Sequence, residues 1–348
     1  MSNKAKAYAA HTVGAPLSPF EFERRSLGAN DVAVKITYSG ICHSDIHTVR
    51  GEWGKVLTPC VPGHEIVGTV TEVGSQVKKF EVGDLIGVGV FVDSCRKCPN
   101  CLRGLGHYCF EGMTGTYNTI ERDGHTVAQG GYSNLIVVDE NFAVHIPDNL
   151  SLPGVAPLMC AGITLYSPLR HWGAGPGKKV GVIGLGGLGH MGVKFAAAMG
   201  AEVTVFSHSP AKEEDARAMG AHDFVVTKDI RILGEMENSF DLLLNTVSAE
   251  IDLEPYIKVL RLDGTLVVIG LPGKPYSINA GPLLEKRRSI AGSMIGGYPE
   301  LQEMIDFCGE HNIVSDVEVI EPAYINQAYE RTIASDVKYR FVIDATKF

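Results

Sequence analysis

The chain has 348 residues, 45% of them hydrophobic, which is long enough for two domains with a substantial core. Its 31 Lys and Arg against 40 Asp and Glu give a net charge of −9, and no basic block is present, which argues against binding to a nucleic-acid backbone. The longest uncharged apolar stretch, residues 180–193, is too short and glycine-rich for a membrane span, and the N-terminus has no signal-peptide core, so we expect a cytoplasmic protein without a membrane partner.

The first 150 residues predict a β-rich, barrel-like domain. Short runs with alternating apolar residues follow one another closely, and glycine and proline separate them. The expected strands are residues 31–40, 65–74, 84–91 and 132–139.

After about residue 151 the pattern changes to strands that alternate with helices. This alternation is typical of a parallel, doubly wound sheet. The last fifty residues return to a mixed pattern and end in an expected strand at 338–344, which can complete the first domain. Within the alternating part, strands are expected at 178–184, 201–207, 221–227, 240–247 and 264–270, and helices at 188–200, 210–220 and 251–260.

Four of the eight cysteines lie in one polar loop, residues 93–109. The spacing C-x2-C-x2-C-x7-C lets four thiolates converge on one tetrahedral ion. Four thiolates leave no position for water or substrate, so the expected role is structural. Zinc is favoured over an iron–sulfur cluster, and over free or disulfide-bonded cysteines. The ligands would be Cys95, Cys98, Cys101 and Cys109.

Other metal-binding residue types are dispersed over three segments. Two thiolates and one imidazole would leave a fourth position open, which is the pattern of a catalytic zinc, and the charges of such a site sum to zero. Taken singly, each residue is ordinary, because a lone buried cysteine is usually a small hydrophobe. The candidates are Cys42, His43, Ser44, Asp45 and His47, then His64 and Glu65, then Cys160 and Thr164.

Residues 184–189 read GLGGLG, a G-x-G-x-x-G motif between an expected strand and an expected helix. The first glycine permits a tight turn, the second lets backbone amides approach a pyrophosphate, and the third allows close helix–strand packing. This context makes it a dinucleotide-binding motif. Its members are Gly184, Leu185, Gly186, Gly187, Leu188 and Gly189.

The residues at the end of the expected strand 201–207 indicate whether NADH or NADPH binds. An acidic residue there would bind the ribose hydroxyls of NADH and repel a 2′-phosphate. No acid is present; the segment instead offers hydroxyl groups and a cation, which favours NADPH over NADH. These residues are Ser207, His208, Ser209 and Lys212.

Together these motifs, in this order, resemble the zinc-dependent medium-chain dehydrogenases/reductases. Residues 157–170, 292–297 and 338–344 narrow the resemblance to the cinnamyl alcohol dehydrogenase branch, and above all to its bacterial NADPH-dependent aldehyde reductases. The resemblance extends from about residue 5 to the C-terminus.

The resemblance implies a GroES-like catalytic domain formed by residues 1–150 and 296–348, and a Rossmann domain at 151–295. It implies two zinc ions per chain, one structural in the four-cysteine loop and one catalytic. The catalytic ligands would be Cys42, His64 and Cys160, with Glu65 as an alternate ligand.

The resemblance also assigns roles around the catalytic zinc. Asp45 would orient the His64 imidazole, and Ser44 and His47 would pass a proton between substrate and solvent. Trp53 and Ile295 would line a pocket for an aromatic or medium-chain aldehyde. The remaining NADP(H) contacts would be His43, Thr164, Thr246, Ile269, Gly270, Ser293, Ile295 and Arg340.

The expected reaction is therefore reversible hydride transfer between NADPH and an aldehyde, with zinc as the Lewis acid. A homodimer through residues 289–296 is also expected from the resemblance. Two alternatives are a zinc-independent quinone or enone reductase and a non-enzymatic cofactor-binding protein. A Ser–His hydrolase is disfavoured because no G-x-S-x-G motif is present.

Overall fold

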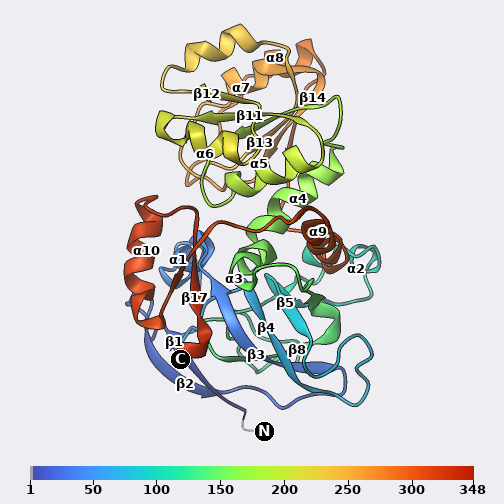
Figure 1. Ribbon diagram of the computed structural model, residues 1–348, viewed down its shortest axis with the longest axis vertical. Helices are drawn as coiled ribbons and strands as arrows, with labels where there is room; N and C mark the ends of the chain where they lie inside the picture. Colours follow the sequence, from blue (N-terminus) through green and yellow to red (C-terminus); the bar gives the residue numbers. More distant parts are fainter. Residues whose placement is uncertain (1–2) are drawn as a thin grey trace. The chain divides into compact units, whose positions relative to one another are not determined.

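The computed structural model describes residues 3–348, and the chain forms two compact units (Figure 1). The first contains the described residues up to Ile163 together with Gly296–Phe348, and the second contains Thr164–Ile295. The chain therefore leaves the first unit once, builds the second from one continuous segment, and returns.

The main sheet of the first unit draws strands from both ends of the sequence. Its strands are β3 (Asp31–Gly40), β4 (Ile66–Val73), β5 (Leu85–Val88), β8 (Leu135–Asp139), β9 (Val144–His145), β16 (Val317–Ile320) and β17 (Arg340–Asp344). The strand order is β16-β17-β3-β4-β5-β9, and β8 also pairs with β3. The fully buried β-branched side chains of Val32, Val34 and Ile36 suit the central strand β3, because they pack well on a pleated surface.

Shorter elements surround this sheet. They are the antiparallel pair β1 (Lys4–Ala9) and β2 (Ser18–Glu23), the pair β6 (Phe91–Asp93) and β7 (Thr114–Gly115), and the helices α1 (His43–Val49), α2 (Pro99–Leu102), α3 (Leu152–Val155), α9 (Tyr298–His311) and α10 (Ile325–Ile333). Helix α10 packs against β17 and α1 (Figure 1). One hydrophobic core joins Ile46 of α1, Tyr329 of α10, Phe341 of β17 and the buried Tyr132.

The second unit is a sheet in which all strand pairings are parallel. Its strands are β10 (Lys179–Ile183), β11 (Glu202–Ser207), β12 (Asp223–Val226), β13 (Phe240–Asn245), β14 (Leu260–Val268) and β15 (Ser289–Gly292), in the order β12-β11-β10-β13-β14-β15. Helices α5 (Gly189–Ala198) and α6 (Glu213–Ala218) lie on one side, and α7 (Glu254–Val259) and α8 (Gly281–Glu285) on the other (Figure 1). The parallel, doubly wound sheet predicted from the sequence is confirmed. Because the strand order reverses between β10 and β13, the loops after these strands flank the crevice where such sheets bind ligands.

Some predicted strands have different limits in the structure. The strand expected at 84–91 is divided into β5 and β6 at Gly89, whose N–H donates to the Tyr298 hydroxyl and whose carbonyl accepts from Thr116. Side chains thus replace a neighbouring strand as hydrogen-bond partners. The strand expected at 132–139 begins only at Leu135, because the residues before it bond elsewhere: the Tyr132 N–H donates to the carbonyl of Pro62, and the Asn134 N–H donates to the carbonyl of Lys6.

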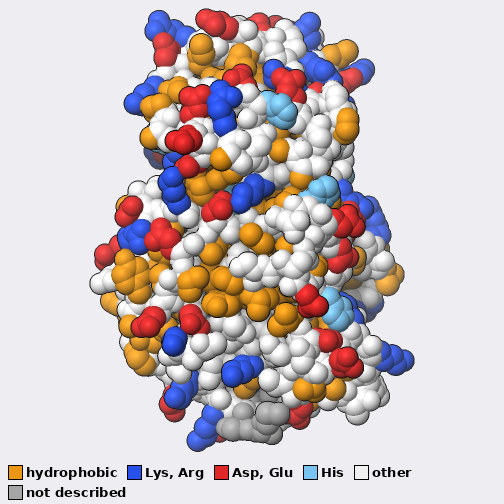
Figure 2. Space-filling view, in the orientation of Figure 1, with side chains coloured by type: hydrophobic (Ala, Val, Ile, Leu, Met, Phe, Trp, Pro, Cys, Tyr) orange, Lys and Arg blue, Asp and Glu red, His pale blue; other side chains and the backbone are white. Residues whose placement is uncertain are grey.

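Basic and acidic side chains are interspersed over the face drawn in Figure 2. Among residues 3–348, no single helix is long and apolar enough to cross a membrane. Two consecutive helical segments, Leu152–Met159 and α4 (Ala161–His171), would together be long and apolar enough, but they are bent by 60° relative to each other.

Candidate active site and metal centres

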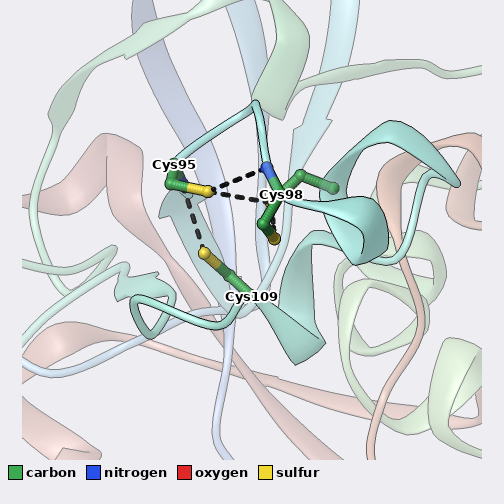
Figure 3. Close-up of side chains that lie close together, drawn as sticks. Cys95, Cys98 and Cys109 are labelled. Atoms are coloured by element: carbon green, nitrogen blue, oxygen red, sulfur yellow. Dashed lines mark hydrogen bonds between the residues drawn. The ribbon is translucent and has the colours of Figure 1, made fainter.

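The four-cysteine loop brings its sulfur atoms into one compact group (Figure 3). All four Sγ atoms lie within 4.8 Å of one another; Cys98 and Cys101 are 3.5 Å apart, and Cys95 and Cys101 are 3.8 Å apart. The backbone N–H of Cys95 donates to the Sγ of Cys109, and that of Cys98 donates to the Sγ of Cys95, each over 3.3 Å. The loop is thus folded around its own thiols.

This arrangement fits a tetrahedral zinc ion. Four sulfurs about 2.3 Å from a central zinc would lie about 3.8 Å from one another, whereas a disulfide would bring two of them to about 2.05 Å. Backbone N–H groups, first that of Phe110 and then that of Cys101, lower the pKa of the Cys98 thiol to about 6. The loop thus stabilises a thiolate at Cys98, whereas burial raises the pKa of Cys101 to about 11, so a bound cation would be needed to favour the thiolate there.

A second group of metal-binding side chains is buried in the first unit. Cys42, His64, Glu65 and Cys160 each offer a ligand atom within 4.8 Å of the others. They come from three separate segments: Cys42 immediately precedes α1, His64 and Glu65 immediately precede β4, and Cys160 immediately precedes α4. The mutual hydrogen bond of the two thiols lowers the pKa of Cys42 well below its usual value and raises that of Cys160. One thiolate therefore forms readily even in this buried position.

The Asp45 carboxylate connects the segments that carry these ligands by hydrogen bonds. It is fully buried and accepts four hydrogen bonds: from the backbone N–H of Cys42 (3.0 Å) and Gly63 (3.1 Å), from His64 Nδ1 (3.0 Å) and from the Tyr132 hydroxyl (3.1 Å). Burial opposes protonation of His64, but the neighbouring Asp45 charge raises its pKa well above the usual value. Because Nδ1 donates to Asp45, Nε2 is the atom turned toward a metal ion.

Glu65 forms a buried ion pair with Arg340, which lies 275 residues further along the chain. Arg340 Nη2, on β17, donates to Glu65 Oε1 and to the carbonyl of Ile41. Within residues 3–348, the second carboxylate oxygen of Glu65 has no hydrogen-bond partner, and burial raises the pKa of Glu65 to about 8. A Cβ on Gly40 would lie 2.1 Å from that oxygen, so the glycine makes room for it.

These four residues fit a zinc ion. Two sulfurs, an imidazole nitrogen and a carboxylate oxygen are the donor types that zinc takes in proteins. The unpartnered carboxylate oxygen is a further sign, because buried polar atoms normally have partners. If Glu65 does not bind, Cys42, His64 and Cys160 leave one position open.

Both predicted proton-relay residues lie on α1, and one of them, Ser44, contacts this group. The Ser44 hydroxyl donates to Cys42 Sγ over 2.9 Å and lies 3.5 Å from His64 Nε2. His47 follows one helical turn later; its Nδ1 bonds to the Glu52 carboxylate, and its ring stacks on Trp53 with a centroid distance of 5.0 Å. Trp53, the predicted pocket residue, is 54% exposed.

The dinucleotide motif lies at the crevice of the second unit, between β10 and α5. Gly184 has a φ of +90° in the tight turn. A Cβ on Gly189 would lie 2.0 Å from the carbonyl oxygen of Gly184, whereas a Cβ on Gly186 would have no atom within 4 Å. The loop is therefore tightly packed at Gly189 and open at Gly186, which fits a pyrophosphate that approaches the backbone there.

The predicted phosphate-binding segment connects directly to this motif. Lys212 Nζ donates to the carbonyl of Leu185 over 2.7 Å, and the Ser209 N–H donates to Ser207 Oγ over 3.2 Å. The lysine thus lies beside the motif, where its charge attracts phosphate. His208 is exposed.

Other predicted cofactor residues occupy neighbouring loop and strand ends. Thr246 Oγ1 donates to the carbonyl of Ile183, and the N–H groups of Ile269 and Gly270 both donate to the carbonyl of Asn245. The Ser293 N–H donates to the carbonyl of Val268. The remaining predicted residues are the exposed His43 before Ser44, the buried Thr164 on α4, and Ile295, whose φ is +42°.

Two family models match the chain. The alcohol dehydrogenase GroES-like domain matches residues 28–148, and the zinc-binding dehydrogenase model matches residues 187–310. The chain belongs to the zinc-binding dehydrogenases. The predicted GroES-like and Rossmann fold class and the resemblance stated from the motifs are thereby confirmed.

This dehydrogenase is similar to known proteins over nearly its whole length. It is 60% identical to the NADP-dependent alcohol dehydrogenase C 1 of Mycolicibacterium smegmatis, with 97% of each chain covered. It is 54% identical to the aldehyde reductase YahK of Escherichia coli, with 98% of each chain covered. A cinnamyl alcohol dehydrogenase of Sorghum bicolor has a TM-score of 0.95 and 43% identity, covering 99% of this chain and 98% of that one.

Four side chains of this dehydrogenase's metal-binding unit were not singled out from the sequence. Tyr117 stacks on the His64 ring with a centroid distance of 5.9 Å, and Tyr132 reaches Asp45. Tyr329 donates to the Tyr132 hydroxyl, and Glu52 bonds to His47. Glu52 alone had a signal in the sequence, since it lies within a few residues of His47; the tyrosines come from distant segments without a motif.

Proposed function

We propose that this zinc-binding dehydrogenase is an NADP-dependent alcohol dehydrogenase that works as an aldehyde reductase. The observation that carries the proposal is the buried group of Cys42, His64 and Cys160 with the Ser44 hydroxyl at its edge. The names of the relatives, an NADP-dependent alcohol dehydrogenase and an aldehyde reductase, support the same activity.

Two zinc ions and one dinucleotide would bind to this chain. Zinc at Cys42, His64 and Cys160 supplies Lewis acidity toward the substrate oxygen, and NADP(H) supplies or accepts the hydride. The four thiols of the 93–109 loop would hold the second zinc, which stabilises the loop and takes no part in the chemistry.

Ser44 and His47 would move the proton that accompanies the hydride. The Ser44 hydroxyl lies against two of the donor atoms, Cys42 Sγ and His64 Nε2, so it lies next to a substrate oxygen held at this group. His47 is three residues further on, on the same face of α1, and its side chain is 33% exposed. Because Glu52 accepts from His47 Nδ1, the Nε2 of His47 is left to exchange a proton, which would reach it from Ser44 through the nicotinamide ribose and pass on to solvent.

NADP(H) is the proposed dinucleotide because of the chemistry at the end of β11. Ser207 ends this strand where NAD-binding sheets place an acidic residue. Lys212 adds a positive charge beside the glycine motif. Hydroxyl groups and a cation favour a 2′-phosphate, and the absence of a carboxylate removes a repulsion.

An aromatic or medium-chain aldehyde is the proposed substrate class. Support comes from the indole of Trp53, which stacks on His47 and leaves half of its surface exposed for a flat or apolar group. The similar Sorghum bicolor protein is named a cinnamyl alcohol dehydrogenase, and cinnamaldehyde is such a substrate.

We further propose a cytoplasmic homodimer. Within residues 3–348 no disulfide joins the eight cysteines, six of which are the proposed zinc ligands, and a reducing compartment keeps such thiols available for metal. Strand β15 is an edge of its sheet, and edge strands are ready to pair with a second copy. The nearby Leu271 and Leu284 are 67% and 81% exposed. Light scattering should give twice the monomer mass, and a monomer at micromolar concentration would refute the dimer.

The test of the proposed activity is to measure initial rates of NADPH and NADH oxidation with cinnamaldehyde on the zinc-loaded protein. We expect a strong rate with NADPH, a weaker rate with NADH, and two zinc equivalents per chain. A rate that survives complete zinc removal from the folded protein would favour a zinc-independent reductase. Absence of turnover with any aldehyde would favour a protein that binds the dinucleotide without using it.

A further inference from the structure

Asp45 has a partner beyond the metal-binding group. Two of its four hydrogen bonds come from backbone N–H groups next to the ligands, and one comes from His64 itself. The fourth comes from the hydroxyl of Tyr132, which lies 87 residues further along the chain and is fully buried. A buried carboxylate depends on such donors, because water cannot replace a lost one.

The position of the Tyr132 ring is set on several sides. Its backbone N–H donates to the carbonyl of Pro62 over 2.9 Å, which ties its loop to the segment that carries His64. A Cβ on Gly63 would lie 2.5 Å from the ring, so the ring lies flush against the backbone at a glycine with a φ of +103°. The Arg24 guanidinium donates to three carbonyl groups of the same loop, those of Gln129, Gly130 and Leu135.

A second tyrosine completes the path. The hydroxyl of Tyr329, on α10, donates to the Tyr132 hydroxyl over 3.4 Å, and the two rings meet edge to face. The Tyr132 hydroxyl can therefore accept one hydrogen bond and donate another. Consecutive hydrogen bonds polarise one another, so the bond from Tyr329 strengthens the hydrogen bond that the Tyr132 hydroxyl donates to Asp45.

We propose that Tyr132 is a positioning residue for the metal ligand His64. Its hydroxyl fixes the rotation of the Asp45 carboxylate, and the carboxylate fixes the His64 ring with Nδ1 as donor and Nε2 directed at Cys42 and Cys160. The consequence is slow metal loss from this site, because groups that orient a ligand typically change metal affinity by about 10–100-fold. This inference rests on the proposed function, since it assumes zinc at Cys42, His64 and Cys160.

The test is the rate at which the full-length, zinc-loaded protein transfers zinc to an excess of a chromogenic chelator. Tyr132→Phe removes only the hydroxyl, and we expect one of the two zinc equivalents to leave about 10-fold faster than in the wild type. The other equivalent, from the four-cysteine loop, should leave at the wild-type rate. Cobalt substitution gives a second readout, because the visible spectrum of the catalytic-site cobalt should change with its ligand geometry.

Tyr298→Phe is the matched control. Tyr298 is also a buried tyrosine of the first unit, and its hydroxyl accepts from Gly89 N–H and donates to the carbonyl of Phe91, without contact to Asp45. Both variants should lose a similar amount of thermal stability, but only Tyr132→Phe should accelerate zinc release from the catalytic site. If Tyr132→Phe does not fold, Tyr329→Phe keeps the Tyr132 bond to Asp45 and should accelerate release in the same direction by a smaller factor.

The possible failures are distinct. A wild-type chain that holds zinc only in the four-cysteine loop, and none at Cys42, His64 and Cys160, would overturn the proposed function and this inference together. A wild type with two equivalents, and a folded Tyr132→Phe variant whose zinc release and cobalt spectrum match those of Tyr298→Phe, would overturn the inference alone. If Tyr329→Phe is the variant used, wild-type zinc release and a wild-type cobalt spectrum in that variant would also overturn the inference alone.

Discussion

Alanine substitutions at two glycines of the dinucleotide motif should have different effects, one on thermal stability and the other on NADPH affinity. At Gly189 the new Cβ would lie 2.0 Å from the carbonyl oxygen of Gly184, so the backbone must move by at least about 1 Å. Overpacking of this kind costs about 1–3 kcal/mol. Since Gly189 is the first residue of α5, the alanine recovers little helix propensity. At about 2 °C per kcal/mol, Gly189→Ala should lower the Tm by about 2–6 °C.

Gly186→Ala should leave stability almost unchanged. Its Cβ would have no atom within 4 Å, so the folded protein has room for it, and the expected change is within about 0.5 kcal/mol. The same Cβ would occupy the space where a pyrophosphate approaches the backbone. We expect the Kd for NADPH to rise at least about 10-fold, which corresponds to about 1.4 kcal/mol.

The assay compares thermal unfolding of the cofactor-free variants with NADPH binding followed by fluorescence titration. We expect opposite phenotypes: Gly189→Ala should mainly lose thermal stability, and Gly186→Ala should mainly lose affinity for NADPH. If Gly186→Ala melts as early as Gly189→Ala, or binds NADPH as tightly as the wild type, the motif does not work as described.

Three further substitutions test the other sites. Cys95→Ser should lower the Tm and remove one zinc equivalent while the folded fraction keeps its kcat; a purely kinetic defect with unchanged melting would count against a structural zinc. Ser207→Asp should shift the ratio of kcat/KM values toward NADH, and an unchanged ratio would remove Ser207 from the phosphate site. His47→Gln should lower kcat by about 100-fold, in part restored by added imidazole, because it removes an acid–base group; steady-state rates that stay at the wild-type level would exclude His47 from the relay.

The parts of this fold that the sequence could predict are those with local signals. The alternation of strands and helices after residue 151 predicted the parallel sheet because its elements carry their own periodicity, and some end close to a glycine, as α5 does before Gly200. The four-cysteine loop was equally local, since all its ligands lie within residues 93–109. The division of residues 84–91 at Gly89 was missed, because its cause is the hydroxyl of Tyr298 more than 200 residues away.

The dispersed site was open to prediction only in part. Cys42, His64 and Cys160 belong to recognisable motifs, but composition and spacing alone do not bring three segments together. The supporting contacts were not predictable in the same way: Tyr132 lies in no recognised motif, and the motif that contains Arg340, residues 338–344, gives no sign that it pairs with Glu65. Tyr132 reaches Asp45, and Arg340 reaches Glu65, only because the main sheet and its core fold around them. The resemblance placed Arg340 among the NADP(H) contacts; within the first unit its side chain donates hydrogen bonds to Glu65 and Ile41.

Strand β17 imposes an order on biosynthesis. The second unit is one continuous segment, so it can fold as soon as it leaves the ribosome, when β3 can already pair with β4 and β8 but not yet with β17. Arg340, on β17, joins Glu65 across 275 residues of chain, and thus the buried carboxylate of Glu65 stays without its counter-charge until β17 has been synthesised. A nascent chain stalled before β17 would leave the end of β3 at residues 38–40 without its antiparallel neighbour and Glu65 without Arg340, and an unpaired strand edge of this kind favours aggregation.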